Sequence, residues 1–279
     1  MNEKTIAFIG GGNMAASLIG GLISDGYQAR KIGVSDPDQA KLNHLKAQYG
    51  ISISSNNDDL IAQADIVVLA VKPQMMKAVI TQFDSAIQIK DPLIISIAAG
   101  IREIDILQWL GNPQMALVRT MPNTPATVQC GATALHASPN VSAEQKELAE
   151  SVMRAVGMTL WVDQEKDLDA VTALSGSGPA YFFLFMEAME KSASKLGLDP
   201  DTARLLTLQT AFGAAKMALE CPEDTHTLRT NVTSPGGTTE QAINTLQAGG
   251  LEALIDDALK AAYTRSVELS EILGENRNG

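Results

Sequence analysis

A glycine-rich cluster near the start of the sequence has the spacing of a phosphate-binding turn. It reads Gly10-Gly11-Gly12-Asn13-Met14-Ala15 and matches the pattern G-x-G-x-x-A. Gly10 would permit a tight turn, Gly12 would let the main chain approach a pyrophosphate, and Ala15 would let a helix pack closely on a strand. The N–H groups at the start of that helix would attract the anion. The pattern therefore predicts a dinucleotide site, provided that a strand precedes it and a helix follows it.

A carboxylate follows this cluster at the spacing typical of a ribose ligand. Asp36 comes about 20 residues after Ala15, where an acidic residue commonly binds the 2′-OH of an adenosine ribose. A carboxylate there favours NAD and repels the 2′-phosphate of NADP. The segment Asp36-Pro37-Asp38 could equally cap the next helix, and both interpretations stay open.

The elements that must position these residues alternate along the first half of the chain. Buried strands are expected at residues 5–9, 31–35, 66–71, 93–97, 115–119 and 131–135, and helices at 15–24, 38–48 and 74–83. Continuous apolar strands separated by helices are typical of an α/β, doubly wound parallel sheet of the Rossmann type, covered on both faces.

Three loops follow the predicted strands. Ligands of such sheets bind beyond the carboxyl ends of the strands. We therefore expect Ala70-Val71-Lys72-Pro73 and Ala98-Ala99-Gly100 to face the cofactor, although Lys72 could also be a solvated loop lysine. Met121-Pro122-Asn123-Thr124-Pro125 is a stiff polar loop that either shapes an active site or simply connects two elements.

The pattern becomes helical after about residue 165. We expect an apolar helix at 181–196, a helix at 200–220 with Asp199 as N-cap and Pro200 in its first turn, and a long last helix from 251. The predicted domains are therefore 1–165, which binds the dinucleotide, and 166–279, which is helical. A partner subunit would cover the apolar helix.

Two clusters of small residues mark the helical half. Ser175-Gly176-Ser177-Gly178-Pro179 allows close packing or is a simple helix entry. The second cluster runs from Ser234 to Gln241, and it predicts a helix with Thr238 as N-cap and Gln241 as its capping-box partner. Free N–H groups at such a start suit a carboxylate, whereas a purely structural cap is the alternative.

Composition excludes several classes of protein. The 279 residues carry a formal net charge of −11, which argues against nucleic acid or an anionic membrane as partner. No apolar run approaches the length of a membrane helix, and the first residues lack the features of a signal peptide. Two cysteines and three scattered histidines predict neither a disulfide framework nor a metal site. A cytoplasmic location is expected.

Taken together, the motifs resemble those of the pyrroline-5-carboxylate reductase family over nearly the whole chain. The last two of the matching segments are the most discriminating. The segments are 8–14, 70–73, 96–100, 121–125, 175–180 and 234–239.

This resemblance implies a function and an assembly. The family reduces the cyclic imine 1-pyrroline-5-carboxylate to L-proline, the last step of proline biosynthesis, normally with NADPH and sometimes with NADH. Its helical domain binds the substrate and forms a homodimer, often within a larger ring of dimers. Asp36 departs from the usual NADPH preference.

The resemblance also implies roles for individual residues. Thr239 matches the threonine near the imine nitrogen and is the catalytic candidate. The substrate-binding candidates are Ser234, Gly236, Gly237, Thr238 and Thr239. The cofactor-binding candidates are Gly10, Gly11, Gly12, Asn13, Met14, Ala15, Asp36, Asn57, Ala70, Val71, Lys72, Pro73, Ala98, Ala99 and Gly100.

Two other functions would fit the same order of a dinucleotide-binding domain followed by a helical domain. A β-hydroxyacid dehydrogenase would need a catalytic lysine in the helical half, where Lys191 and Lys195 lie outside any matching glycine-rich motif. A non-catalytic, dinucleotide-binding redox sensor would have no use for the carboxylate site predicted at 234–239.

Overall fold

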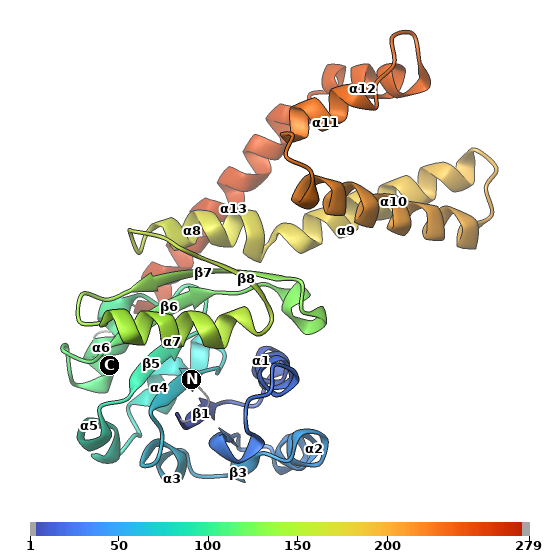
Figure 1. The fold of residues 1–279 in the computed structure, drawn as a ribbon. Helices are drawn as coiled ribbons and strands as arrows, with labels where there is room; N and C mark the ends of the chain where they lie inside the picture. Colours follow the sequence, from blue (N-terminus) through green and yellow to red (C-terminus); the bar gives the residue numbers. More distant parts are fainter. Residues whose placement is uncertain (1–3, 275–279) are drawn as a thin grey trace. The chain divides into compact units, whose positions relative to one another are not determined.

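The computed structural model describes residues 4–274, which fall into two compact units (Figure 1). The first unit runs up to Ser177 and also includes the end of the chain from Ala262, and the second is Gly178–Ala261. The chain therefore passes between the units twice. The domain boundary predicted between residues 165 and 166 precedes α8 (Asp167–Val171) and stays a prediction.

The first unit is built on one sheet. Within residues 4–274 eight strands pair in the order β3-β2-β1-β4-β5-β6-β7-β8. The order reverses beside β1, because β2 lies on one side of it and β4 on the other. This reversal is the ligand-binding switch point of doubly wound sheets, so the predicted fold class is confirmed. The strands are β1 (Ile6–Ile9), β2 (Ile32–Ser35), β3 (Ser52–Ser54), β4 (Ile66–Leu69), β5 (Leu93–Ser96), β6 (Leu117–Met121), β7 (Gly131–Ala137) and β8 (Gly157–Trp161).

One strand pair departs from the predicted parallel sheet. β6 and β7 are antiparallel, whereas β7 and β8 are again parallel. The connection from β6 to β7 contains only the 3₁₀ turn η3 (Thr124–Val128). A parallel pair needs a crossover of roughly a dozen residues or more. The short connection therefore forces the strand to return beside its neighbour in the opposite direction.

Helices cover both faces of the sheet, as predicted. Alternate residues of β1 point to opposite faces, so that Phe8 packs in one buried cluster and Ile9 in the other. The first cluster also takes apolar residues from α1 (Asn13–Ser24), α2 (Gln39–Tyr49) and α7 (Ala143–Arg154). The second takes them from α3 (Asn57–Ile61), α4 (Met76–Ile80), α5 (Ala86–Lys90) and α6 (Glu103–Leu110).

The second unit is helical, and its first helices expose large apolar side chains. Asp199 accepts hydrogen bonds from the N–H groups of Asp201 and Thr202, and Pro200 is the first helical residue, both as predicted. Phe183 is 64% exposed, and its neighbours on α9 and α10 are similarly uncovered. No helix within residues 4–274 is long and apolar enough to span a membrane. The helices are α9 (Gly178–Lys195), α10 (Pro200–Glu220), α11 (Thr225–Asn231), α12 (Thr238–Ala248) and α13 (Leu251–Gly274), the last of which continues into the first unit.

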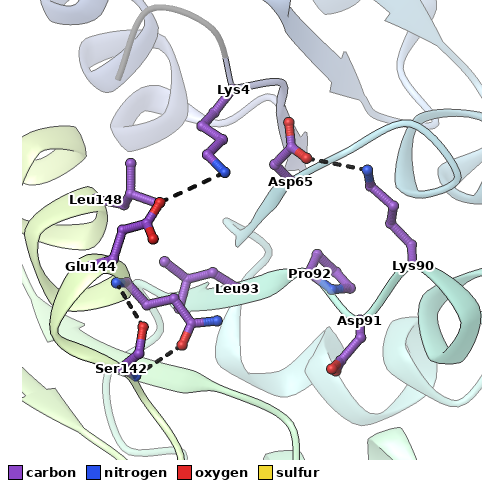
Figure 2. A pocket seen from close by; sticks show the side chains of 10 residues that line it. Lys4, Asp65, Lys90, Asp91, Pro92, Leu93, Ser142, Glu144 and Leu148 are labelled. Carbon is purple, nitrogen blue, oxygen red and sulfur yellow. Dashed lines mark hydrogen bonds and ion pairs between the residues drawn. The ribbon is translucent and has the colours of Figure 1, made fainter.

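A cavity of about 320 Å³ lies at the amino ends of β1, β4 and β5 (Figure 2). Lys90 Nζ lies 3.1 Å from Asp65 Oδ1, and Lys4 Nζ lies 3.9 Å from Glu144 Oε1. Burial favours a higher pKa for Asp65, but hydrogen bonds from the Thr5 N–H and the Lys90 ammonium outweigh it and lower that pKa. These charges compensate one another, and none of the predicted site residues lines this cavity.

Candidate active site

The turn between β1 and α1 is closely packed at one glycine and open at another. Gly10 has φ +103°, and a Cβ there would lie 2.7 Å from the carbonyl oxygen of Ala70. Gly12 is the N-cap of α1, where no side chain caps the helix. A Cβ at Gly12 would meet no atom within 4 Å. The open space at an uncapped helix start fits a pyrophosphate, because the first N–H groups of a helix have no partner within it.

Asp36 binds the glycine turn, and a different aspartate caps the helix. Asp36 Oδ2 accepts the N–H of Gly11 at 2.9 Å, and its Oδ1 accepts the N–H of Asp38 at 2.9 Å. The N-cap of α2 is Asp38, which accepts the N–H groups of Ala40 and Lys41. The cap of α2 therefore belongs to Asp38, and the role of Asp36 toward a ribose stays a prediction. The Asp36 carboxylate stays beside the turn, where a ribose hydroxyl could reach it.

Asn57 joins this group through a side-chain hydrogen bond. The hydroxyl of Ser35, the last residue of β2, donates to Asn57 Oδ1 at 2.6 Å. The bond ties the first residue of α3 to the carboxyl end of β2, next to Asp36 in the chain. Asn57 therefore lies at the sheet edge where the adenosine half of a dinucleotide would bind.

The loops after β4 and β5 lie at the same edge. The N–H of Ala70 donates to Ile9 O at 2.8 Å, and the N–H of Ile97 donates to Leu69 O at 3.3 Å. These bonds continue the pairing of β1, β4 and β5 past the ends of the strands. Lys72 itself is exposed. The structure thus gathers the loops that carry the predicted cofactor residues at one edge of the first unit.

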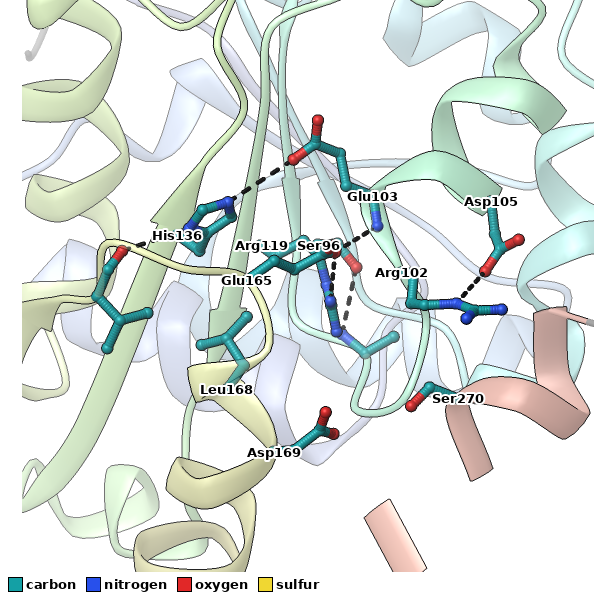
Figure 3. Close-up of polar contacts among 12 residues, drawn as sticks. Ser96, Arg102, Glu103, Asp105, Arg119, His136, Glu165, Leu168, Asp169 and Ser270 are labelled. Atoms are coloured by element: carbon teal, nitrogen blue, oxygen red, sulfur yellow. Dashed lines mark hydrogen bonds and ion pairs between the residues drawn. The ribbon is translucent and has the colours of Figure 1, made fainter. Parts of the chain in front are cut away.

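A buried arginine anchors the segment that follows the β5 loop (Figure 3). Arg119 lies on β6, is 8% exposed, and pairs with Glu165 at 2.5 Å. The same carboxylate oxygen accepts the N–H of Glu103 at 2.5 Å. Because Glu103 is the first residue of α6, which lacks a cap from its own N-cap side chain, Glu165 caps that helix from a distant part of the chain. A carboxylate is favourable at this positive end of the helix.

Glu103 also faces a histidine. His136 Nδ1 lies 3.3 Å from Val162 O, and a carbonyl only accepts, so Nδ1 carries the hydrogen. The other ring nitrogen, His136 Nε2, lies 3.8 Å from Glu103 Oε2. Burial raises the pKa of Glu103, and the nearby Glu165 carboxylate raises it further.

The end of α13 supports the other side of the β5 loop. Gly100 has φ +72°, and a Cβ there would contact Leu273 Cδ1 at 3.6 Å and Leu269 Cβ at 3.7 Å. The hydroxyl of Ser266 donates to Asp169 Oδ1 at 2.6 Å. Sequence reasoning missed these supports and the Arg119–Glu165 pair, since their partners are far apart in the chain and belong to no motif.

In the second unit, the predicted carboxylate site is a tight turn followed by α12. The N–H of Gly237 donates to Ser234 O at 3.0 Å. Pro235 and Gly236 occupy the two central positions, and the φ of +72° at Gly236 is that of a type II turn. Glu240 Oε2 accepts the N–H of Gly236 at 2.9 Å and thereby fixes the turn to the first turn of the helix.

The predicted capping box at Thr238 and Gln241 is wrong. The N-cap of α12 is Gly237, with no side-chain cap, and Thr238 is already inside the helix. A side chain cannot be accommodated at the N-cap, since a Cβ on Gly237 would lie 2.9 Å from Ser234 O. The structure has a capping box at Ser142 and Gln145 of α7 instead. The helix start at Gly237 therefore keeps its N–H groups for another acceptor.

The fold and this edge of the sheet define a class of protein. A doubly wound sheet with an open glycine turn at its switch point is an architecture that binds dinucleotides, and it is common among nicotinamide-dependent oxidoreductases. Residues 5–100 match the family model described as NADP oxidoreductase coenzyme F420-dependent. Residues 165–269 match the model for pyrroline-5-carboxylate reductase dimerisation.

Individual relatives specify the family. The chain is 52% identical to a pyrroline-5-carboxylate reductase of Pseudomonas aeruginosa, over 99% of this chain and 100% of the relative. The structure of such a reductase from Coxiella burnetii has a TM-score of 0.92 at 47% identity, covering 95% of this chain and 98% of the other. That of Plasmodium falciparum, with NADP bound, has a TM-score of 0.85 at 27% identity, covering 97% and 99%. The chain belongs to the pyrroline-5-carboxylate reductase family, as its motifs predicted, and is an NAD(P)H-dependent oxidoreductase.

The alternative dehydrogenase shares the fold alone. A 3-hydroxyisobutyrate dehydrogenase structure from Mycobacterium tuberculosis has a TM-score of 0.51 at 16% identity, covering 98% of this chain and 99% of the other. Lys191, one of the two lysines considered for that chemistry, is exposed and forms an ion pair with Glu187 one helical turn away. This pairing is that of an ordinary helix surface.

The openness at Gly12 gives a direct test of the dinucleotide site. Gly12→Val should fold normally, since φ at this position is −73° and the space is open. Its side chain should nevertheless block the pyrophosphate and weaken dinucleotide binding by about tenfold or more. Calorimetric titration with NADPH and NADH measures this effect.

The neighbouring glycine supplies the matched control. Gly10→Ala should lower the melting temperature, because its φ of +103° and the nearby Ala70 carbonyl leave no room for a side chain. Unchanged affinity in folded Gly12→Val would show that the dinucleotide phosphates bind elsewhere.

Proposed function

We propose that the chain reduces 1-pyrroline-5-carboxylate to L-proline with NADPH, and accepts NADH as a second donor, in the last step of proline biosynthesis. The observation that carries the proposal is the uncapped helix start at Gly237, preceded by a rigid turn. Such a start suits the carboxylate of the substrate, and the open turn at Gly12 suits the cofactor. A non-catalytic redox sensor would need only the second of these features.

The proposed cofactor residues belong to the first unit. The start of α1 holds the pyrophosphate, and Asp36 and Asn57 face the adenosine ribose. The loops Ala70–Pro73 and Ala98–Gly100 line the same edge of the sheet. When bound, the nicotinamide supplies the hydride that the reaction needs.

The proposed substrate residues belong to the second unit. The N–H groups of the first turn of α12 take the substrate carboxylate, together with the Ser234 hydroxyl, since a helix N-terminus favours an anion. Gly236 and Gly237 give the turn its shape, Thr238 contributes its N–H, and Thr239 directs its hydroxyl to the imine nitrogen. A protonated imine already carries the proton required at nitrogen, so the residues act by binding and orienting.

Thr239 gives the sharpest test of this assignment. Thr239→Ala removes one hydroxyl and leaves the N–H groups of α12 in place, so kcat should fall by about 10²-fold with a smaller change in KM. Thr239→Ser restores the hydroxyl and should recover much of the turnover. Steady-state kinetics with 1-pyrroline-5-carboxylate decides the matter.

Thr238→Ala is the matched control for this pair. Because Thr238 is not the N-cap, its side chain caps nothing, and the substitution should change neither kcat nor stability greatly. A crippled Thr238→Ala enzyme beside a near-normal Thr239→Ala enzyme would reverse the assigned roles.

The choice of cofactor depends on Asp36. Its carboxylate should repel the 2′-phosphate of NADPH, so Asp36→Ser should shift the ratio of kcat/KM values toward NADPH. Asp38→Ser is the matched control, because it changes the nearby cap of α2 and leaves the Gly11 contact intact. If the ratio of kcat/KM with NADPH to kcat/KM with NADH is the same in Asp36→Ser, Asp36 does not select the cofactor and only accepts the Gly11 N–H.

We also propose that the helical unit assembles into a homodimer, that such dimers can join into a larger ring, and that the protein acts in the cytoplasm. The exposed apolar side chains of α9 and α10 and the match to a dimerisation domain support the dimer. Cys130 and Cys221 are free thiols, which suits a reducing compartment.

The assembly is tested by placing a charge on α9. Phe183→Glu should shift the protein toward a monomer in light scattering, because burying an unpaired carboxylate at an interface is costly. Ile89→Glu is the control, since Ile89 is 83% exposed on α5 of the first unit. An active, stable monomer of the unaltered chain would refute the proposal.

A further inference from the structure

Two motifs from the sequence have no role in the proposed site, and the structure joins them through Asn123. Asn123 belongs to the loop after β6 and is only 9% exposed. Its Oδ1 accepts the N–H of Ala132 at 2.9 Å, and its Nδ2 donates to the carbonyl of Ser175 at 3.1 Å. The N–H can only donate and the carbonyl can only accept, so the two partners define the orientation of the amide.

The carbonyl of Ser175 needs a donor from outside its own helix. In an uninterrupted α-helix it would accept the N–H of the residue four positions later. That residue is Pro179, which has no N–H. The Asn123 side chain, which is itself buried, supplies a hydrogen bond to this half-buried carbonyl in place of the one that Pro179 cannot donate.

The helix is irregular at this point. α8 runs into a π-helical turn, Thr172–Gly176, in which the N–H of Ser177 donates to Thr172 O at 2.8 Å. α9 then begins at Gly178. Isolated π turns are frequent at functional sites, and they persist only when surrounding contacts hold them.

A second contact lies between the same turn and the last residue of β6. The terminal methyl of Met121 lies where a Cβ on Gly176 would be, so the Met121 side chain packs directly against this turn. Met121 ends β6 and Asn123 lies in the loop that follows it, whereas Ser175 and Gly176 belong to one turn. The two motifs therefore interlock by one close packing contact and one hydrogen bond.

We propose that Asn123 is a positioning residue that sets the break between α8 and α9 by replacing the hydrogen-bond donor that Pro179 lacks. The chain leaves the first unit at this break, between Ser177 and Gly178. The residues proposed for the cofactor precede the break in the chain, and those proposed for the substrate follow it. Because a misplacement of about 1 Å can cost about 100-fold in rate, loosening the break should lower kcat.

The first experiment removes the donor alone. Asn123→Asp keeps the acceptor for the Ala132 N–H but sets a carboxylate oxygen against the Ser175 carbonyl. It should lower the apparent Tm by about 3–8 °C and kcat by about tenfold, with KM for both substrates within about twofold. Asn140→Asp is the matched control, because Asn140 is exposed and its Nδ2 also donates to a main-chain carbonyl, that of Pro113 at 3.2 Å.

The second experiment tests the part played by Pro179. In the Pro179→Ala background, residue 179 has an N–H that can serve the Ser175 carbonyl. In this background, the decrease in apparent Tm caused by Asn123→Asp should be less than half of its decrease in the unaltered chain. The value of kcat should stay low, because Asn123 no longer holds the break between α8 and α9. All proteins are compared at one concentration.

Each outcome bears on the proposal. Equal Tm losses in the two backgrounds would show that Asn123 does not substitute for the missing donor. A lowered Tm with unchanged kcat would reduce Asn123 to a structural residue and overturn the positioning role. The kcat measurement rests on the proposed reaction, but the Tm comparison does not. An unaltered chain that fails to reduce 1-pyrroline-5-carboxylate would therefore count against that reaction alone.

Discussion

Both proposed binding sites depend on the first N–H groups of a helix whose N-cap residue is glycine and therefore has no side chain to occupy them. α1 begins after Gly12 and α12 after Gly237, and neither has a side-chain cap. Elsewhere in the described chain α2, α7, α10 and α11 are capped by Asp or Ser side chains. Replacing such a cap with Ala costs about 0.5–2 kcal/mol, whereas glycine costs only a few tenths. A glycine cap thus leaves the first N–H groups available to an anion at a small cost in stability.

The start of α6 shows what happens when such groups are not left for a ligand. Its own N-cap side chain, Arg102, cannot accept a hydrogen bond, and the Glu165 carboxylate takes the first N–H instead. Arg119 compensates the charge of that carboxylate. Through Glu165, the start of α6 is therefore held to Arg119 of β6. Glu165 itself lies two residues before α8. A rigid edge of the sheet is useful beside a cofactor whose reactive ring must be held in place.

Local patterns predicted the first unit well, because its features depend on nearby residues. The glycines at 10 and 12 and the central strands follow from short-range spacing, and so does the cap at Asp199 in the second unit. The short strand β8 was missed, since its residues alternate between half-buried and exposed and resemble no apolar run. β6 and β7 are antiparallel because the connection between them is short. The sequence prediction considered the apolar runs and not the length of the connections.

The error at Thr238 has a different origin. Thr-x-x-Gln matches a capping box, but the pattern does not record that the preceding turn brings Ser234 O against Gly237. The contact at Gly237 allows no side chain, so the helix begins one residue earlier than the pattern indicates. The sequence of the glycine-rich segment at 175–179 could not decide between close packing and a simple helix entry, because it does not show that the Ser175 carbonyl accepts a hydrogen bond from Asn123. Hydrogen bonds across such distances in sequence require the fold to be known.

The two units differ in how much of their apolar surface is buried within one copy of the chain. The first buries its apolar residues in two clusters on either side of the sheet. In the second, Gly178 is the only residue of α9 that is buried, and Phe182, Phe183 and Leu184 are each more than 60% exposed. Helices gain most of their stability from packing an apolar face, so α9 and α10 need a surface that one copy of the chain does not provide. The match to a dimerisation domain supports the proposal that a second copy of the chain provides that surface. Folding of the second unit is then linked to assembly, and its stability rises with protein concentration.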